Sequence, residues 1–247
     1  MNTHSLLVVS VCILCLLATG CIGSPESSDS YRSSYSYDLT ISFTEVIHNA
    51  TFLFPYPSPG FDPILSGLYG LPDGWQAEIV TIDGDRFLSI TASVMVPSYH
   101  GMPIAIEPGE SPLPPTPSFS SHYSEETPVL MPENLVIGYD PGRTIETKNP
   151  EGTEPLLLFT PVEGGRCTIP DMHDQPCSAI TTPVYASYEG SPEVEVEVWV
   201  RFSGGNQWWN LGWSGNSYIQ ICSARFTGPQ DGWSRMHGDM VAGVGRY

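Results

Sequence analysis

One serine of this sequence, Ser214, stands in a pattern typical of a catalytic nucleophile. In "LGWSGNSY" it follows Gly212 by two residues, as in the G-x-S-x-G turn that exposes the serine of many hydrolases. Asn216 replaces the second glycine of that pattern, and the residues that follow alternate as in a strand rather than a helix. We therefore expect Ser214 to be non-catalytic, and an extracellular hydrolase stays an alternative function.

The histidines offer neither a general base nor a metal site. They show no HxxxH or similar ligand spacing, so a surface or structural role is expected for each. The sequence predicts no catalytic residue, no metal and no cofactor. The histidines beyond the N-terminal segment are His48, His100, His122, His173 and His237.

The cysteines of the C-terminal half suggest one disulfide bond. In an exported chain, Cys167 and Cys177 of "CTIPDMHDQPC" are expected to close a short loop, a bond worth about 3 kcal/mol by the loop-entropy estimate. Two aspartates and a histidine in this loop make a metal site the alternative, although the spacing matches no closed zinc pattern. Cys222 lies in an alternating apolar stretch and is predicted to be a buried free thiol.

Four tryptophans are candidates for ligand binding. Trp208, Trp209 and Trp213 fall within six residues, and adjacent strand positions point to opposite faces, so one of the first two faces outward. Trp199 lies between inward-facing valines and must project outward too. We predict an exposed platform, with neighbouring indoles about 5 Å apart where they lie directly opposite, that binds glycan. A second surface protein would fit the same face, and burial of the indoles in a core is the alternative.

The elements that position these residues read as β-strands almost throughout. "YDLTISFTEV" and "EVEVEVWVRF" alternate apolar and polar residues, the period of half-buried strands. Asp83 and Gly84 predict a tight hairpin turn between two further strands. "SGGN" (residues 203–206) predicts a second turn, after which the chain returns through "QWWNLGW".

These strands predict a single-domain, antiparallel β-sandwich over residues 37–247. Residues 97–132 contain nine prolines, which exclude an interior strand because proline donates no ladder hydrogen bond. We expect a long surface loop there, and a linker between two halves is the alternative. Asn49, in "NATF", is an N-glycosylation acceptor sequence.

The N-terminal residues predict export and a lipid anchor. Residues 1–20 carry no charged side chain and contain an apolar run too short to span a bilayer, as in a signal peptide. Small residues precede Cys21, as in a lipobox, where the new N-terminal cysteine carries lipid. Residues 21–36 are rich in serine and are expected to form a flexible tether. Ordinary secretion and retention of the segment as an anchor stay open.

Charge excludes one function class, and the motifs support another. The chain has 27 acidic and nine basic residues, so its surface repels nucleic acid. The lipobox-like start, the scarcity of lysine and the run from "SYEGSPEVEVEV" through "WWNLGWSGNSY" to "TGPQDGW" resemble exported archaeal lipoproteins, particularly those of methanogens. That resemblance implies the outer face of the cell membrane and no known activity. We predict a lipid-anchored cell-envelope protein with a non-catalytic structural or ligand-presenting role, and a carbohydrate-binding module is the first alternative.

Overall fold

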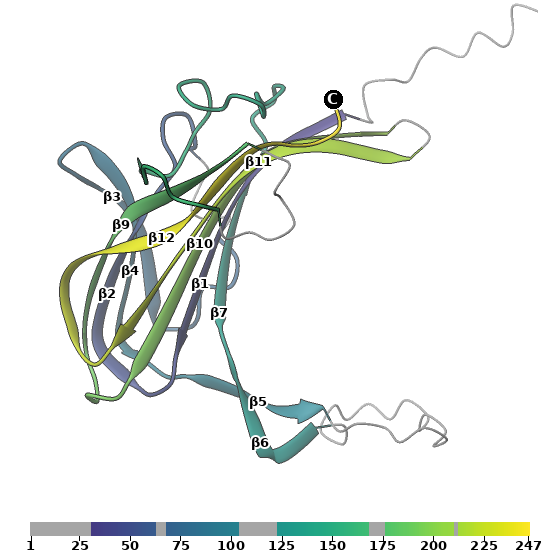
Figure 1. Cartoon of the computed structure of the whole chain (residues 1–247). Helices are drawn as coiled ribbons and strands as arrows, with labels where there is room; N and C mark the ends of the chain where they lie inside the picture. Colours follow the sequence, from purple (N-terminus) through teal and green to yellow (C-terminus); the bar gives the residue numbers. More distant parts are fainter. Residues whose placement is uncertain (1–30, 63–67, 104–122, 168–175, 210–211) are drawn as a thin grey trace, which may run out of the picture.

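The protein is built from β-strands (Figure 1). The computed structural model describes residues 31–62, 68–103, 123–167, 176–209 and 212–247. Every strand pairing in this part is antiparallel. This confirms the predicted fold class. The strands are β1 (Tyr31–Phe43), β2 (Ile47–Pro55), β3 (Trp75–Ile82), β4 (Asp85–Met95), β5 (Ser98–Pro103), β6 (Tyr123–Met131), β7 (Glu133–Tyr139), β8 (Thr160–Pro161), β9 (Cys177–Glu189), β10 (Glu195–Trp209), β11 (Trp213–Thr227) and β12 (Gln230–Gly245).

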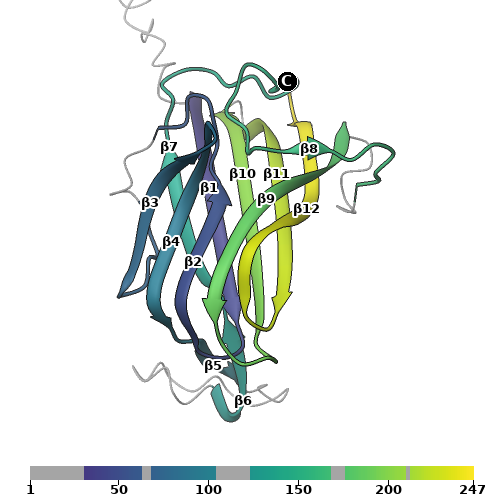
Figure 2. The ribbon, with the colours of Figure 1, turned by 90° about the vertical axis from the view of Figure 1, so that its left-hand side faces the viewer.

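Ten of the strands form one strongly curled sheet (Figures 1 and 2). Its order is β3-β4-β2-β9-β12-β11-β10-β1-β7, with β8 added on β9. The backbone of Tyr69, shortly before β3, exchanges two hydrogen bonds of 3.0 Å with Val136 of β7. The segment that leads into one edge strand therefore joins the other edge strand, and the curled sheet encloses its own core.

The core is packed by aromatic side chains from opposite parts of this sheet. Alternate residues of β1, including Tyr37 and Leu39, are fully buried, as the sequence alternation predicts. The Tyr37 ring lies 5.7 Å from the ring of Tyr56, which follows β2, and Phe43 lies 6.3 Å from Trp75 of β3. Distant strands of one sheet thus pack face to face, as the two layers of a sandwich do.

Sheet pairing joins residues on both sides of the proline-rich stretch. β1 pairs with β7 and β10, and β2 pairs with β9, so elements before and after residues 97–132 share one sheet. Within the stretch, β5 and β6 form a separate two-stranded ribbon that projects from one end (Figure 1). Proline is tolerated in such a ribbon because each strand has a free edge. Residues 104–122 lie outside the described residues.

Two boundaries differ from the sequence expectation. β1 begins at Tyr31, so residues 31–36, assigned above to the tether, belong to the sheet. The strand was missed because these residues are rich in serine, although buried and exposed positions alternate there and Ser33 and Tyr35 are buried. The turn predicted at residues 203–206 was also wrong, because β10 runs through them to Trp209 in unbroken register with β1 and β11. The hairpin at Asp83 and Gly84 is confirmed, with positive φ values of 53° and 95°.

An end loop, residues 140–159, covers the end of the core nearest the C-terminus. A buried carboxylate holds it, because the Glu154 side chain is only 2% exposed. Its oxygens accept hydrogen bonds from both terminal nitrogens of Arg143, at 2.7 and 2.8 Å, and from the Tyr35 hydroxyl at 2.5 Å. The Glu146 amide donates a further bond of 2.8 Å. These contacts join the end loop to β1.

Candidate functional site: an outward groove on β10

The outward side chains of β10 form one continuous row. Because strand residues alternate between faces, the row begins with Glu195 and Glu197 and continues from Trp199 through Arg201, Ser203, Gly205 and Gln207 to Trp209, while the intervening residues face the core. Trp199 and Trp209 are 48% and 55% exposed. They stand ten residues apart, about 33 Å along the strand.

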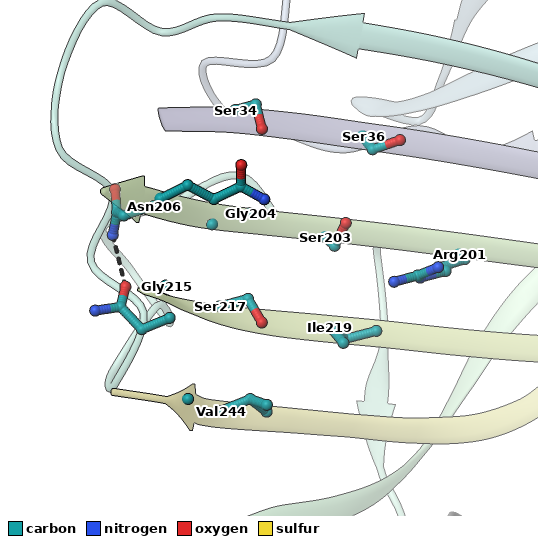
Figure 3. Close-up of a pocket in the computed structure, with 14 residues that line it drawn as sticks. Ser34, Ser36, Arg201, Ser203, Gly204, Asn206, Gly215, Ser217, Ile219 and Val244 are labelled. Carbon is teal, nitrogen blue, oxygen red and sulfur yellow. Dashed lines mark hydrogen bonds between the residues drawn. The ribbon is translucent and has the colours of Figure 1, made fainter. Parts of the chain in front are cut away.

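The middle of this row lies in a groove that crosses four neighbouring strands. Its volume is about 310 Å³. Figure 3 shows Ser34 and Ser36 of β1, Ser203 of β10 and Ser217 of β11 over the same surface, with Val244 of β12 at its margin. The groove surface is therefore rich in hydroxyl groups and exposed backbone.

Glycines line part of the groove and allow close packing beneath it. A β-carbon at Gly204 would lie 2.6 Å from the Tyr218 ring, and one at Gly215 would lie 2.6 Å from the Asn206 carbonyl oxygen. Tyr218 in turn donates a 2.7 Å hydrogen bond to the carbonyl of Pro155 in the end loop. Close contact between β10, β11 and the loop thus depends on residues that have no side chain.

A satisfied amide network supports the groove from the inner side. Asn206 is buried, and its oxygen accepts hydrogen bonds from the Ser33 hydroxyl at 2.8 Å and from the Ile145 amide at 3.0 Å. Its nitrogen donates to the Ile145 carbonyl at 2.9 Å and to the Asn216 side-chain oxygen at 2.8 Å (Figure 3). Every hydrogen-bonding position of this buried amide is used, so the groove floor is held in one arrangement.

Two indoles stand at the far end of the groove. Trp209 and Trp213 face each other in register across β10 and β11, with ring centroids 5.6 Å apart and planes at 77°. Trp213 is 65% exposed. Each lies two residues from a groove residue, Gln207 and Gly215 respectively, so the indole pair extends the groove surface by about 7 Å.

The predicted platform of adjacent indoles takes a different form. Trp199 projects outward as expected, but its strand neighbours are Thr40 and Ser223, so no second indole lies opposite it. Trp208 faces the inner side and stacks on Tyr31 at 6.2 Å. Sequence alternation correctly predicted that one of Trp208 and Trp209 faces outward. The sequence prediction placed the indoles beside one another because it assumed a turn at residues 203–206, where β10 in fact continues.

A fifth tryptophan, Trp233 of β12, is also exposed on the outer face. It is 50% exposed and packs edge-on against Phe87 at 5.2 Å and Tyr185 at 5.5 Å. It borders a separate hollow of about 400 Å³ with Arg235. Trp233 lies outside the β10 row and provides a matched reference for the indoles of the row.

The register places Ser214 far from the described C-terminal histidine. His237 pairs with Ser223, which lies nine residues along β11 from Ser214, about 30 Å away. A nucleophile must lie within hydrogen-bond reach of its base. Ser214 and His237 therefore form no catalytic pair, and the "LGWSGNSY" resemblance to a hydrolase turn carries no chemistry between them.

The described residues contain one disulfide bond and one free cysteine. Cys167 and Cys177 form the predicted disulfide, with their α-carbons 6.1 Å apart. They lie close to Asp239, but bonded sulfurs supply no thiolate for a metal. Cys222 is a buried free thiol, as expected. Burial, together with the charge of Asp239, raises the pKa of that thiol to about 12.

Asn49 and Cys21 are the two remaining predicted sites. Asn49 has a positive φ of 50° where the β2 register shifts, and its amide donates a 3.2 Å hydrogen bond to Glu189. Its glycosylation stays a prediction. Cys21 lies outside the described residues, as does the middle of the disulfide loop. Within the described part of the chain, no helix has the length and apolar content that a membrane crossing requires.

Comparison with known proteins adds no assignment. Neither a protein family, nor a curated protein, nor a solved structure matches this chain.

The groove itself was missed by sequence reasoning, because Ser34, Ser203 and Ser217 are distant in the chain and read as ordinary polar strand residues. The one available signal was the alternation of β10, which continues from Trp199 to Trp209 once the glycines are read as strand.

Proposed function

We propose that this chain is a non-catalytic, lipid-anchored protein of the cell envelope that binds an extended saccharide along β10. The observation that carries the proposal is the outward row of that strand, in which exposed indoles stand at both ends of a hydroxyl-rich groove. Indoles offer apolar faces on which sugar rings stack. Hydroxyl and amide groups between them supply hydrogen bonds that orient a polar ligand.

The geometry favours a chain-like ligand over a compact one. The groove lies on the outward face of the sheet and extends across four strands, whereas a site for a small molecule usually encloses most of its ligand. The distance from Trp199 to Trp209, about 33 Å along the strand, far exceeds a single sugar ring. A saccharide chain that follows β10 can contact both indole sites and the serines between them.

The saccharide proposal can be tested with a glycan array and the full-length protein. We expect the wild type to retain a polymeric glycan, and Trp209→Ala to weaken retention at least tenfold because it removes a stacking surface. Trp233→Ala is the matched control, since this indole is equally exposed on another strand. Equal retention by all three proteins would place the ligand elsewhere, and no retention of any glycan by the folded wild type would overturn the proposal.

A groove-filling variant separates loss of stacking from loss of space. Ser203 faces outward and lines the groove, so Ser203→Phe inserts a ring without entering the core. We expect binding to be lost while the thermal unfolding midpoint changes little. Unchanged binding would show that the saccharide does not occupy the groove.

The lipid anchor is tested separately, through Cys21. Membrane fractionation of cells that express the wild type and Cys21→Ser should place the first with membranes and the second in the aqueous fraction. Cys222→Ser serves as control, because this thiol is buried within the sheet. The anchor is wrong if wild type and Cys21→Ser fractionate alike.

A further inference from the structure

The groove differs in charge from the rest of the protein. The chain has three times as many acidic as basic residues, yet the fourteen residues that line the groove include one arginine and no aspartate or glutamate. At the acidic fraction of the whole sequence, 27 of 247 residues, fourteen residues would carry about one or two carboxylates. The lining of the groove therefore contains no carboxylate, and Asp38, which is hydrogen-bonded to Ser36 of the lining, stands at its margin.

The one charged group of the groove, Arg201, has no acidic partner among the described residues. The ion pairs of these residues involve Arg86, Arg143 and Arg225 instead. Asp38 pairs with Arg201 in the β1 register, but its carboxylate accepts hydrogen bonds from Ser36, at 3.2 Å to each oxygen. Figure 3 shows the Arg201 side chain directed along the sheet surface toward the serines. Its guanidinium donors are thus available to a ligand.

A second arginine lies at the opposite end of the groove. Arg32 stands opposite Gln207, is exposed, and lies on the same side of β1 as Ser34, which lines the groove. It is six residues from Asp38, the register partner of Arg201, so the two guanidinium sites are separated by about 20 Å along the strand. Hydroxyl groups occupy the surface between them.

We propose that the saccharide bound along β10 is anionic, with uronate carboxylates paired to Arg201 and Arg32. This inference rests on the proposed saccharide-binding function. Guanidinium binds carboxylate through two parallel hydrogen bonds, a geometry that lysine does not reproduce. The acidic surface around the groove repels an anionic chain at long range, so the affinity arises from these contacts and from stacking inside the groove.

The preference can be measured with matched ligands and the full-length protein. Titration calorimetry would compare hexagalacturonate and a hyaluronan hexasaccharide, each with its carboxyl-reduced form. The wild type should bind at least one acidic form about tenfold more tightly than its reduced form. Arg201→Gln should reduce that preference, because it removes one of the two proposed carboxylate partners. Arg235→Gln, which changes an exposed arginine on β12 outside the groove, should retain it.

Each outcome separates the two proposals. Equal binding of acidic and reduced forms by the wild type overturns the anionic preference and leaves saccharide binding intact. A preference that survives both Arg201→Gln and Arg32→Gln also overturns it, because the carboxylate then binds elsewhere. Failure of the wild type to bind any glycan, here or on the array, overturns the saccharide function itself. Matching thermal midpoints for the variants exclude unfolding as the cause.

Discussion

The Tyr218 ring occupies the space in which Gly204 would carry a β-carbon. That atom would lie 2.6 Å from the ring and 2.9 Å from its hydroxyl oxygen, and the same hydroxyl donates to the Pro155 carbonyl. Tyr218 is fully buried. One missing side chain therefore allows β10, β11 and the end loop to pack together.

Replacement of Gly204 by alanine should destabilise the protein. The added methyl displaces a buried ring and its hydrogen bond, for which we expect a loss of about 2 kcal/mol in the free energy of unfolding. Gly138→Ala is the matched control, because a β-carbon there meets no atom within 4 Å. Urea unfolding of both variants measures the difference. Equal stability of the two variants would show that the Tyr218 ring can move aside for a β-carbon at position 204.

Removal of the buried charge of Glu154 should loosen the end loop. Glu154→Gln retains the shape but loses charge-assisted hydrogen bonds from Arg143 and Tyr35. We expect the free energy of unfolding to fall by about 2 kcal/mol. This is less than for a fully buried ion pair, because Arg143 is half exposed and can be solvated by water when its partner loses charge. Glu197→Gln breaks an exposed pair with Arg225 and should cost less than about 0.5 kcal/mol. Similar losses in the two variants would contradict the role of burial.

The same carboxylate should make stability depend on pH. Burial alone raises the pKa of Glu154, but hydrogen bonds from Arg143, Tyr35 and the Glu146 amide outweigh it and hold the pKa below its ordinary value. Its contribution is complete above the unfolded pKa of about 4.3 and is lost as the pH falls through the lower folded pKa. The stability difference between wild type and Glu154→Gln should therefore shrink between about pH 5 and pH 3 in urea titrations. A stability difference that grows on acidification would contradict a lowered pKa of Glu154 in the folded protein.

The Cys222 thiol should be unreactive in the folded protein. It is buried, and its pKa of about 12 leaves almost no thiolate at pH 8. Iodoacetamide should leave the Cys222 peptide unmodified in native buffer and modify it fully in guanidinium chloride, as measured by peptide mass spectrometry. Rapid native modification would mean that β11 and β12 separate readily.

Local structure was largely predictable from the sequence. Alternating apolar residues determined that β1 and the first half of β10 are strands and which side of each is buried, because side-chain direction has a period of two in any sheet. Asp83 and Gly84 determined a hairpin, since the turn needs positive φ. The disulfide of Cys167 with Cys177 followed from a short loop in an exported chain.

The groove depended on contacts that no local pattern specifies. Pairing of β1 with β10 joins Ser34 to Gly205 across 171 residues, and such pairings are chosen by the packing of the whole core. Gly204 and Gly205 read as a turn, because glycine is the common turn residue. Only the neighbouring strand shows why both are small: a β-carbon at Gly204 would meet the Tyr218 ring, and one at Gly205 would lie 3.1 Å from the Asn216 carbonyl oxygen.

The sequence by itself therefore determined the class of structure, and the tertiary structure decided where its chemistry lies. The alternation of β10 already contained Trp199, Arg201 and Trp209 on one side, since their spacing is even. Their connection by a hydroxyl-rich groove came from the strand order, which sets β1, β10 and β11 side by side and so brings serines of three strands onto one surface. Curl and strand order reflect the summed packing of the aromatic core, which no short stretch of sequence encodes.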